Sequence, residues 1–436
     1  MSQNSFKTIF FFLLSFFISY SHSDDLQQLE LFKEEVLSEH ENILKFWAKY
    51  TIDEDNGGFI GEIDSHLVKN PKADKGVILN ARITWAFSAG YIHTKKKEYL
   101  NIASRAYNYL LEKFYNHEND GVYFMIDYKG NPTVTRNQVI AVAFVTYAFS
   151  EYYRATKDKE VLEYTLKLFN SLETYALDKE YNGYFDAFSE DWEKLDDMRM
   201  YEGDKDAKKT MNANFHIMVA YANIYRSYKE NDKENDKIKN ALKNLIEVLL
   251  DNVIDEKRGS CNLFFDEEWN VIKSDDNYGL DIEASWLIWD AAQVLGDKKI
   301  IDKVKPLVIK IVEHCLKYGY DYNDGGMMNE GNDKEGAVNT YKSWWVQAES
   351  VIAFFNAYQI TNESKYLANS LLTWGFIKKY MIDYKYGEWY GTVSKDDHEP
   401  NMNESKIGPW KCPYHNSRMG LQIAERINSI ISQVKK

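Results

Sequence analysis

The sequence is poor in cysteine and carries no excess of basic residues, and both shortages limit what the protein can be. Its three cysteines, Cys261, Cys315 and Cys412, are too few among 436 residues for a disulfide-stabilised scaffold. Their wide separation also lacks the spacing of a structural zinc site. The 53 Lys and Arg residues are outnumbered by 67 Asp and Glu residues, so the net charge is −14. Because nucleic-acid-binding proteins need a basic surface, we do not expect nucleic acid as a partner.

Long apolar runs are missing beyond the N-terminus. Lys7 precedes an apolar stretch over residues 8–18, which is too short to span a bilayer as a mature helix. Ser21 and Ser23 then offer the small residues that are typical of a cleavage site. We therefore predict a signal peptide over residues 1–23, no stable membrane insertion after its removal, and a secreted or periplasmic protein. An uncleaved membrane anchor is the alternative.

Six glycine-containing turns recur along the rest of the chain, at intervals of roughly 60 to 80 residues, which exceed the usual solenoid repeats. Asp or Asn precedes most of these turns, as positive φ angles favour. Short β-like segments follow them, so we expect a small β-hairpin at each turn. The first glycines of the six turns are Gly57, Gly121, Gly183, Gly259, Gly325 and Gly387.

Between the turns, apolar residues recur at helical spacing. Six helix pairs joined by hairpin-bearing loops can close on themselves, so that no end of the stack needs capping. We therefore predict an all-α fold, a single (α/α)6 toroid or barrel over residues 24–436, with the charged segment 229–239 as a solvated loop. The twelve expected helices lie near residues 26–50, 78–93, 98–115, 137–156, 160–177, 210–229, 236–254, 281–296, 298–318, 343–360, 364–383 and 416–433.

A toroid of this kind brings the N-terminal ends of its inner helices, and the loops leading into them, to one cleft. Packing explains each candidate residue alone; Asn212 and His216, for example, could form a buried hydrogen-bonded pair. Their joint origin in five hairpin-linked units favours a functional cleft. In the last segment, WKCPYHNSR, we expect Asn416 to cap the final helix and His415 to carry protons. The residues expected at the cleft are Arg82, Asn212, His216, Glu283, Trp286, Trp344, Trp345, Gln347, Glu349, Trp410, His415 and Arg418.

Four segments resemble the cellobiose (mannobiose) 2-epimerases of the N-acylglucosamine 2-epimerase superfamily, namely LNARITWAFSAGY, LDIEASWLIWDAA, KSWWVQAESVIAFFNAY and WKCPYHNSR. The resemblance extends from about residue 26 to about residue 426. It implies an (α/α)6 barrel, no cofactor and no metal. It also implies a small-molecule disaccharide or oligosaccharide as partner, whose reducing-end glucose is converted to mannose at C2 when the linkage is β-1,4. We expect the protein to be a monomer.

The implied reaction opens the sugar ring, removes the C2 proton and returns a proton to the opposite face. The enediolate formed on the way needs hydrogen-bond donors or cations where its charge develops. The resemblance assigns catalysis to His415, Arg82, His216 and Glu283. It assigns substrate binding to Asn212, Trp286, Trp344, Trp345, Trp410 and Arg418.

The sequence departs from the family pattern at the second acid/base histidine, where it has Leu280. Asn214 stands where the family often has His, and Ile140 and Val142 stand where Tyr and Gln are expected. Because leucine cannot carry a proton, another residue must act there if the protein is an epimerase.

Three interpretations remain open from the sequence. The first is a sugar epimerase or isomerase in which His216 or Glu283 takes the missing proton role. The second is a glycoside hydrolase or lyase on the same toroid, using carboxylates such as Asp281 and Glu283. The third is an oligosaccharide-binding protein without catalysis, because aromatic walls survive the loss of a base.

Overall fold

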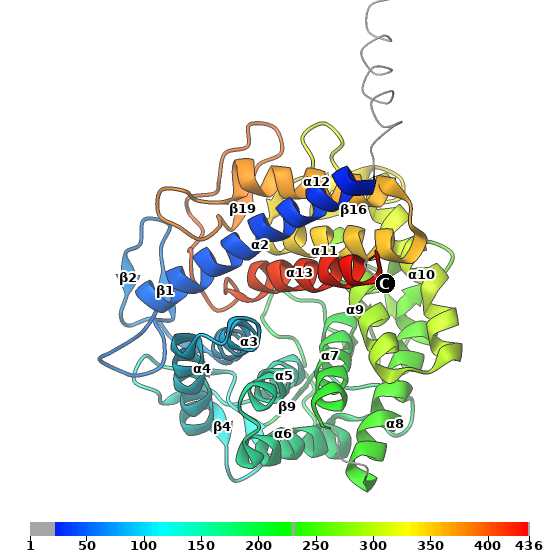
Figure 1. Ribbon diagram of the computed structural model, residues 1–436. Helices are drawn as coiled ribbons and strands as arrows, with labels where there is room; N and C mark the ends of the chain where they lie inside the picture. Colours follow the sequence, from blue (N-terminus) through cyan, green and yellow to red (C-terminus); the bar gives the residue numbers. More distant parts are fainter. Residues whose placement is uncertain (1–21, 229–231, 435–436) are drawn as a thin grey trace, which may run out of the picture.

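The computed structural model describes residues 22–228 and 232–434, and it forms two concentric layers of helices (Figure 1). The predicted signal peptide lies outside these residues except for its last two positions. Each inner helix contacts the next one, and the last inner helix contacts the first, which closes the ring. The inner helices are α3 (Val77–Thr94), α5 (Val139–Thr156), α7 (Met211–Ser227), α9 (Tyr278–Leu295), α11 (Trp344–Thr361) and α13 (Tyr414–Val434).

An outer helix packs against each inner one, and the N-terminal helix α2 pairs with the C-terminal helix α13. Four outer helices continue into π-helical turns, η2 (Leu110–Phe114), η3 (Leu172–Ala176), η4 (Leu249–Val253) and η5 (Ile377–Met381). The twelve predicted helices and the (α/α)6 toroid are thus confirmed. The outer helices are α2 (His22–Tyr50), α4 (Lys97–Tyr109), α6 (Lys159–Ser171), α8 (Lys233–Val248), α10 (Lys298–Tyr318) and α12 (Ser364–Phe376).

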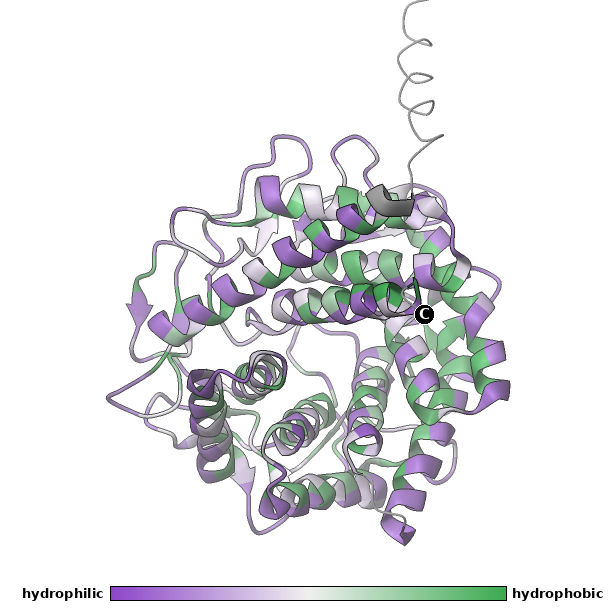
Figure 2. Cartoon of the chain, in the orientation of Figure 1, coloured by the Kyte–Doolittle hydropathy of each residue, from purple (hydrophilic) through white to green (hydrophobic). Residues whose placement is uncertain are grey.

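The two layers differ in sequence pattern because they differ in burial. In α3 every residue from Val77 to Gly90 is buried, whereas α10 buries only one face and turns its charged residues outward (Figure 2). Of the loop predicted over residues 229–239, residues 229–231 lie outside the described residues, and the prediction is wrong from Lys233 on, where α8 begins. Asp232 caps this helix by accepting from the backbone N–H groups of Glu234 and Asn235.

Each predicted hairpin is present, directly after an outer helix. Two are short strand pairs, β4 (Tyr115–Asn116) with β5 (Gly121–Val122) and β11 (Ile254–Asp255) with β12 (Ser260–Cys261). Single antiparallel bridges close the other four, Ile52–Phe59, Leu177–Tyr184, Tyr320–Met327 and Ile382–Trp389. Gly183 shows why glycine is required, since its φ is +71° and a Cβ atom there would lie 2.2 Å from the ring of Trp269.

Further antiparallel strands lead into the inner helices and form the end of the barrel that carries the candidate site. Three sheets have three strands each, and three have two. The three-stranded sheets are β3 (Lys75–Gly76), β6 (Met125–Ile126) and β7 (Pro132–Val134); β10 (Lys209–Thr210), β13 (Phe264–Phe265) and β14 (Val271–Ile272); and β15 (Asp276–Asn277), β16 (Glu330–Asn332) and β17 (Gly336–Asn339). The pairs are β1 (Glu62–Ile63) with β2 (Lys69–Asn70), β8 (Asn137–Gln138) with β9 (Ala187–Phe188), and β18 (Lys342–Ser343) with β19 (Thr392–Val393).

Buried Lys–Asp ion pairs fasten the hairpins to the loops beside them in four of the six units. In each pair the lysine also donates to a backbone carbonyl in the glycine turn. Removing one partner of such a buried pair leaves an uncompensated charge and is strongly destabilising. The pairs are Lys75–Asp53, Lys209–Asp178, Lys342–Asp321 and Lys406–Asp383.

The three cysteines are buried and free. Within residues 22–228 and 232–434, no helix combines the length and the apolar character needed to span a membrane.

Candidate active site

A cavity of about 320 Å³ opens where the inner helices begin, and eight of the ten predicted site residues line it. They come from five inner helices, α3, α7, α9, α11 and α13, and from the loop before α13. Strands β10, β15 and β18 end where α7, α9 and α11 start, so the first helical turns face the barrel axis. The eight residues are Arg82, Asn212, His216, Glu283, Trp344, Trp345, Trp410 and His415.

The first turn of α9 shows how the local sequence positions side chains at the cavity. Asn277 caps this helix, accepting from the backbone N–H of Leu280 at 2.9 Å. Leu280 and Glu283 follow at i and i+3, so both lie on the face of α9 that lines the cavity. Leu280, which stands where the resemblance implies a histidine, is therefore an apolar part of the wall.

His415 and Glu349 form the central hydrogen bond of the site, with 2.7 Å between Nδ1 and Oε1. Burial holds the pKa of His415 well below its ordinary value, although the charge of Glu283 opposes this shift, so the imidazole is neutral near pH 7. A carboxylate only accepts hydrogen bonds, so Nδ1 carries the proton. The lone pair of Nε2 is then free to act as a base.

Two buried carboxylates, Glu283 and Glu349, are held together by one guanidinium. Nη2 of Arg418 lies 2.7 Å from Oε1 of each. The indole N–H of Trp286 donates to Oε2 of Glu349 at 2.8 Å. Burial raises the pKa of both carboxyls, and the neighbouring Glu349 raises that of Glu283 further. The side chains of Glu283, Glu349 and His415 are close enough to hold a metal ion, but Arg418 already supplies the positive charge between the carboxylates.

Arg82 is the cationic group of the cavity without a carboxylate partner. Its guanidinium lies 4.3 Å from the centre of the Phe144 ring and donates to the carbonyl of Trp410 at 3.3 Å. Among the residues that the structure describes, no Asp or Glu lies within ion-pair distance of it, and its Nε has no hydrogen-bond partner. The guanidinium therefore keeps donors for an anionic oxygen in the cavity.

His216 is the second histidine of the cavity. It packs on Phe144, with 4.4 Å between ring centres. Burial, and then the positive charge of Arg82, holds its pKa well below the ordinary value, so it is neutral. Its Nδ1 has no hydrogen-bond partner among the described side chains, and none of its hydrogen bonds reaches Asn212. The hydrogen-bonded pair considered from the sequence is thus absent, and both residues face the cavity instead.

Trp286 and Arg418 do not line this cavity, which corrects their prediction as substrate-binding residues. Each lies one helical turn beyond a lining residue, Trp286 after Glu283 and Arg418 after His415. Three residues advance by about 4.5 Å along a helix axis, which places both side chains deeper in the barrel than the residues that line the cavity. There they bind Glu349, as the distances above show.

Three other expectations need correction. Asn416 lies inside α13 and donates to Glu388 at 2.9 Å, so it does not cap the helix. Gln347 binds the backbone of Met327. Asp281 accepts from the backbone N–H of Cys261 at 2.7 Å and is absent from the cavity lining. The carboxylate pair of Asp281 and Glu283, on which the hydrolase interpretation depended, is not assembled.

Sequence reasoning placed Glu349 at the cleft but gave it no role. Its spacing of four residues from Trp345 was the available signal, since i and i+4 share a helix face. Met200 and Tyr201 were missed altogether. They lie between β9 and β10, where no helix forms, so no periodicity marks them.

Met200 and Tyr201 also line an adjoining cavity of about 450 Å³, which shares Asn212, Asn277 and Leu280 with the first. The two cavities together offer room beyond a single sugar ring. Asp186 lies on the second cavity, and burial raises its pKa to about 7 even though it accepts two hydrogen bonds from Thr210.

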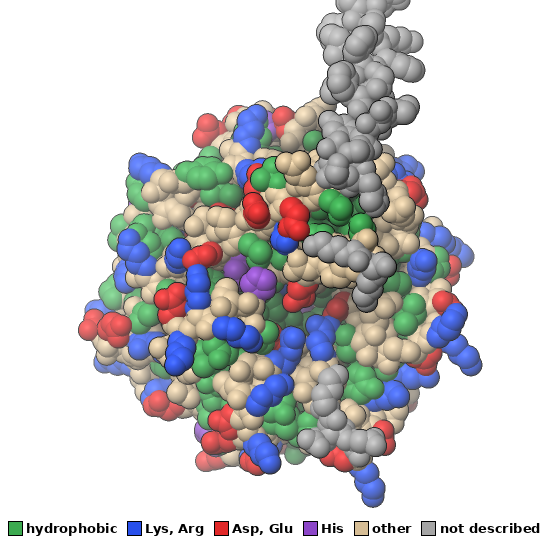
Figure 3. All heavy atoms as spheres, in the orientation of Figure 1, with side chains coloured by type: hydrophobic (Ala, Val, Ile, Leu, Met, Phe, Trp, Pro, Cys, Tyr) green, Lys and Arg blue, Asp and Glu red, His purple; other side chains and the backbone are tan. Residues whose placement is uncertain are grey.

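A third cavity of about 260 Å³ lies where the inner helices end, and Trp286 and Arg418 are among its lining residues. Figure 3 shows a hollowed face with basic, acidic and histidine side chains around it. Charged groups of this cavity pair with each other, as Arg154 does with Glu151 and Arg226 with Asp290. Among the described residues that line it, every arginine has a carboxylate partner, so it lacks the unpaired guanidinium of the first cavity.

The sequence and the fold are similar to those of known proteins. Residues 58–417 match the N-acylglucosamine 2-epimerase (GlcNAc 2-epimerase) family. A cellobiose 2-epimerase of Bacteroides fragilis is 39% identical over 395 residues, which cover 90% of this chain and 99% of that protein. One of Ruminococcus albus is 38% identical over 387 residues, 88% of this chain and 96% of that protein. The solved structure of cellobiose 2-epimerase from Bacillus thermoamylovorans has a TM-score of 0.85 and 38% identity, covering 91% of this chain and all of that one.

Proposed function

The chain belongs to the N-acylglucosamine 2-epimerase family, and we propose that it is a sugar epimerase that acts on the reducing-end sugar of β-1,4-linked disaccharides. The sugar ring opens, a proton leaves C2, and an enediolate forms before reprotonation gives mannose from glucose. The observation that carries this proposal is the pairing, on one cavity, of a neutral histidine oriented by a carboxylate and an arginine without an ion-pair partner.

His415 is the base in this proposal. Glu349 holds the Nδ1 proton, so that Nε2 can take the proton from C2. As the imidazole becomes positively charged, Glu349 and Glu283 lie 2.7 and 3.9 Å from Nδ1 and stabilise the cation. In the reverse reaction, His415 returns the proton to C2 while Glu349 and Glu283 keep the imidazole in place.

Arg82 stabilises the enediolate. Removal of the C2 proton places negative charge on the oxygens of C1 and C2, and donors already aimed at that charge lower the barrier. The rings of Phe144 and Trp410 flank the guanidinium, at 4.3 and 5.8 Å from its carbon, and hold it in place. Trp344, Trp345 and Trp410 offer flat apolar faces for the sugar rings.

Leu280 affects the ratio of ketose to epimer among the products. Epimerisation needs a proton delivered to the C2 face opposite the one attacked, whereas aldose–ketose isomerisation moves a proton from C2 to C1 on a single face. With leucine on the wall, His216 is the other neutral histidine of the cavity that can deliver the second proton. We therefore propose slow epimerisation with a raised ratio of ketose to epimer, isomerisation being the second activity of the same site.

Two further points are proposals from the sequence. Export by the signal peptide over residues 1–23 would place the protein in the periplasm or outside the cell, where oligosaccharides from polysaccharide breakdown occur. We also propose that it works as a monomer.

The test is product analysis by NMR after incubation of the purified chain with cellobiose. The proposal expects β-1,4-linked glucosyl-mannose and the corresponding ketose, with the glycosidic bond intact. Free glucose would show hydrolysis instead, and an unchanged spectrum with bound disaccharide would show a binding protein; either result overturns the proposal.

A further inference from the structure

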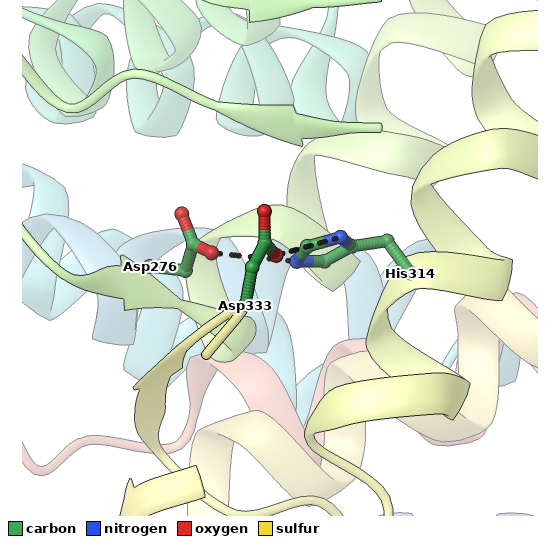
Figure 4. A group of neighbouring side chains, drawn as sticks. All are labelled: Asp276, His314 and Asp333. Atoms are coloured by element: carbon green, nitrogen blue, oxygen red, sulfur yellow. Dashed lines mark ion pairs between the residues drawn. The ribbon is translucent and has the colours of Figure 1, made fainter. Parts of the chain in front are cut away.

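Three side chains converge outside the candidate active site, beside the sheet formed by β15, β16 and β17. They are Asp276 in β15, His314 in α10, and Asp333 in the turn between β16 and β17 (Figure 4). Asp276 and His314 are buried, whereas Asp333 is 44% exposed. One ligand atom from each lies within 4.8 Å of the other two.

The hydrogen bond of His314 leaves a lone pair aimed at Asp276. Nδ1 lies 3.1 Å from the backbone carbonyl of Arg258 and donates to it. In the neutral ring, Nε2 then has no proton, and it faces Oδ2 of Asp276 at 3.5 Å. Neither Nε2 nor Oδ2 has a hydrogen-bond partner among the described residues, although both are buried. Two buried acceptors in this arrangement need a positive charge between them, which either a proton on Nε2 or a metal ion can supply.

The spacing of the two atoms suits a metal ion. Zinc binds imidazole nitrogen and carboxylate oxygen at about 2.0–2.2 Å, so two ligand atoms in a tetrahedral site lie about 3.3–3.5 Å apart. The Nε2–Oδ2 separation of 3.5 Å is at the upper end of this range. Asp333, in an exposed turn, can supply the third ligand atom, and water from the adjoining surface groove the fourth.

The groups around the cluster also match those that support metal ligands. Ligating histidines donate their other ring N–H to a carbonyl or carboxylate, as His314 does, and ligating carboxylates accept a further hydrogen bond. Asp276 accepts one at its other oxygen, from Nη1 of Arg258 at 2.9 Å. Arg258 therefore orients both buried ligands, one through its side chain and one through its backbone.

We propose that Asp276, His314 and Asp333 bind a divalent ion of the zinc type, which joins the β15–β16–β17 sheet to α10. The bound ion also restrains the strands that border the sugar cavity. Asn277, next to Asp276 in β15, lines that cavity and donates to Glu330 of β16 at 3.2 Å. Fixing Asp276 and Asp333 to α10 therefore fixes the strand pair that carries Asn277 and Glu330.

The test is metal content. The full chain is stripped with EDTA, incubated with ZnCl2, dialysed, and measured by mass spectrometry for zinc per chain. We expect one bound zinc and a higher melting temperature than that of the stripped protein. His314→Ala should abolish both effects. Because loss of an outer-shell partner already weakens metal binding by roughly 10–100-fold, Asp333→Asn should weaken it at least as much. Asp333 is in an exposed turn, so this variant should fold.

Two controls locate the ion. His398 faces Asp324 at 3.3 Å, a similar pair for which the described residues offer no third ligand, so His398→Ala should keep the zinc. His415→Ala should also keep it, which separates this site from the active-site carboxylates and makes the result independent of the proposed function. Absence of zinc from the wild type, which would leave a proton as the charge between the two atoms, overturns the proposal. So does equal zinc in Asp333→Asn, or loss of zinc in His415→Ala.

Discussion

Nδ1 of His415 lies 2.7 Å from Oε1 of Glu349, and this hydrogen bond decides which ring nitrogen can act as a base. Glu349 itself has no exposed surface and receives the side chains of Arg418 and Trp286. The carboxylate therefore cannot turn away from the imidazole without losing two other donors. In this arrangement His415 acts on substrate, and Glu349 positions it.

Replacement of Glu349 by glutamine tests that role. The amide can present its oxygen to His415 only by pointing its N–H2 group toward the indole N–H of Trp286, which is also a donor. The imidazole should lose its fixed tautomer. We expect Glu349→Gln to lower kcat by ~10²–10⁴-fold with little change in KM, and to alter the pH profile of kcat. Equal loss in kcat and melting temperature, with an unchanged pH profile, would reduce Glu349 to a structural residue.

Arg82→Lys tests stabilisation of the enediolate. Lysine keeps the positive charge but lacks the planar fork of donors. The lost contacts are strongest in the transition state, so kcat should fall by roughly 10²–10³-fold, more than KM rises. Steady-state kinetics on cellobiose measures both constants. A rise in KM with an unchanged kcat would make Arg82 a residue that binds the ground state only.

The helices could be predicted from the sequence because their signals are local. Apolar residues recur at helical spacing within each helix, and a glycine turn follows each helix pair at a regular interval. The sequence does not show how deep a side chain lies along the barrel axis. Glu283 and Trp286 share a face of α9, yet one lines the cavity and the other lies beneath it. The partners of Arg418 were hidden for a similar reason, since Glu283 and Glu349 are 135 and 69 residues away in sequence. The zinc-type cluster could not be found from spacing, because Asp276, His314 and Asp333 belong to separate elements.

Leu280→His tests the account of the product ratio. A histidine there would lie one turn before Glu283 on the cavity wall and could deliver a proton to C2. We expect faster epimerisation and a lower ratio of ketose to epimer than in the wild type, measured on the same disaccharide. If the wild type already epimerises fast and the variant does not improve it, another residue holds the role, and His216 would be the first to replace.

Asp281→Asn tests the pH dependence of stability. Burial raises the pKa of Asp281 to about 7, above its ordinary value near 3.8. The folded wild type therefore holds a proton that the unfolded chain releases, so this stabilisation is present below about pH 4 and is lost as the pH rises through 7. Asn214 and Gln347 bind equivalent hairpins through both amide atoms, which an asparagine at position 281 could also do.

The asparagine should therefore raise the free energy of unfolding at pH 8 by ~1–3 kcal/mol and have little effect at pH 4. Denaturant unfolding in EDTA at the two pH values measures this without a contribution from a cation at the neighbouring cluster. An advantage of the variant that is the same at both pH values would contradict the raised pKa.

The most direct test of His415 as the base is the exchange of the C2 proton in deuterated water, followed by NMR on cellobiose for the wild type and His415→Ala. The account predicts deuterium at C2 with the wild type and a rate lower by ~10²–10⁴-fold in the variant, whose circular dichroism and melting temperature stay close to those of the wild type. Exchange at the wild-type rate in His415→Ala would contradict it.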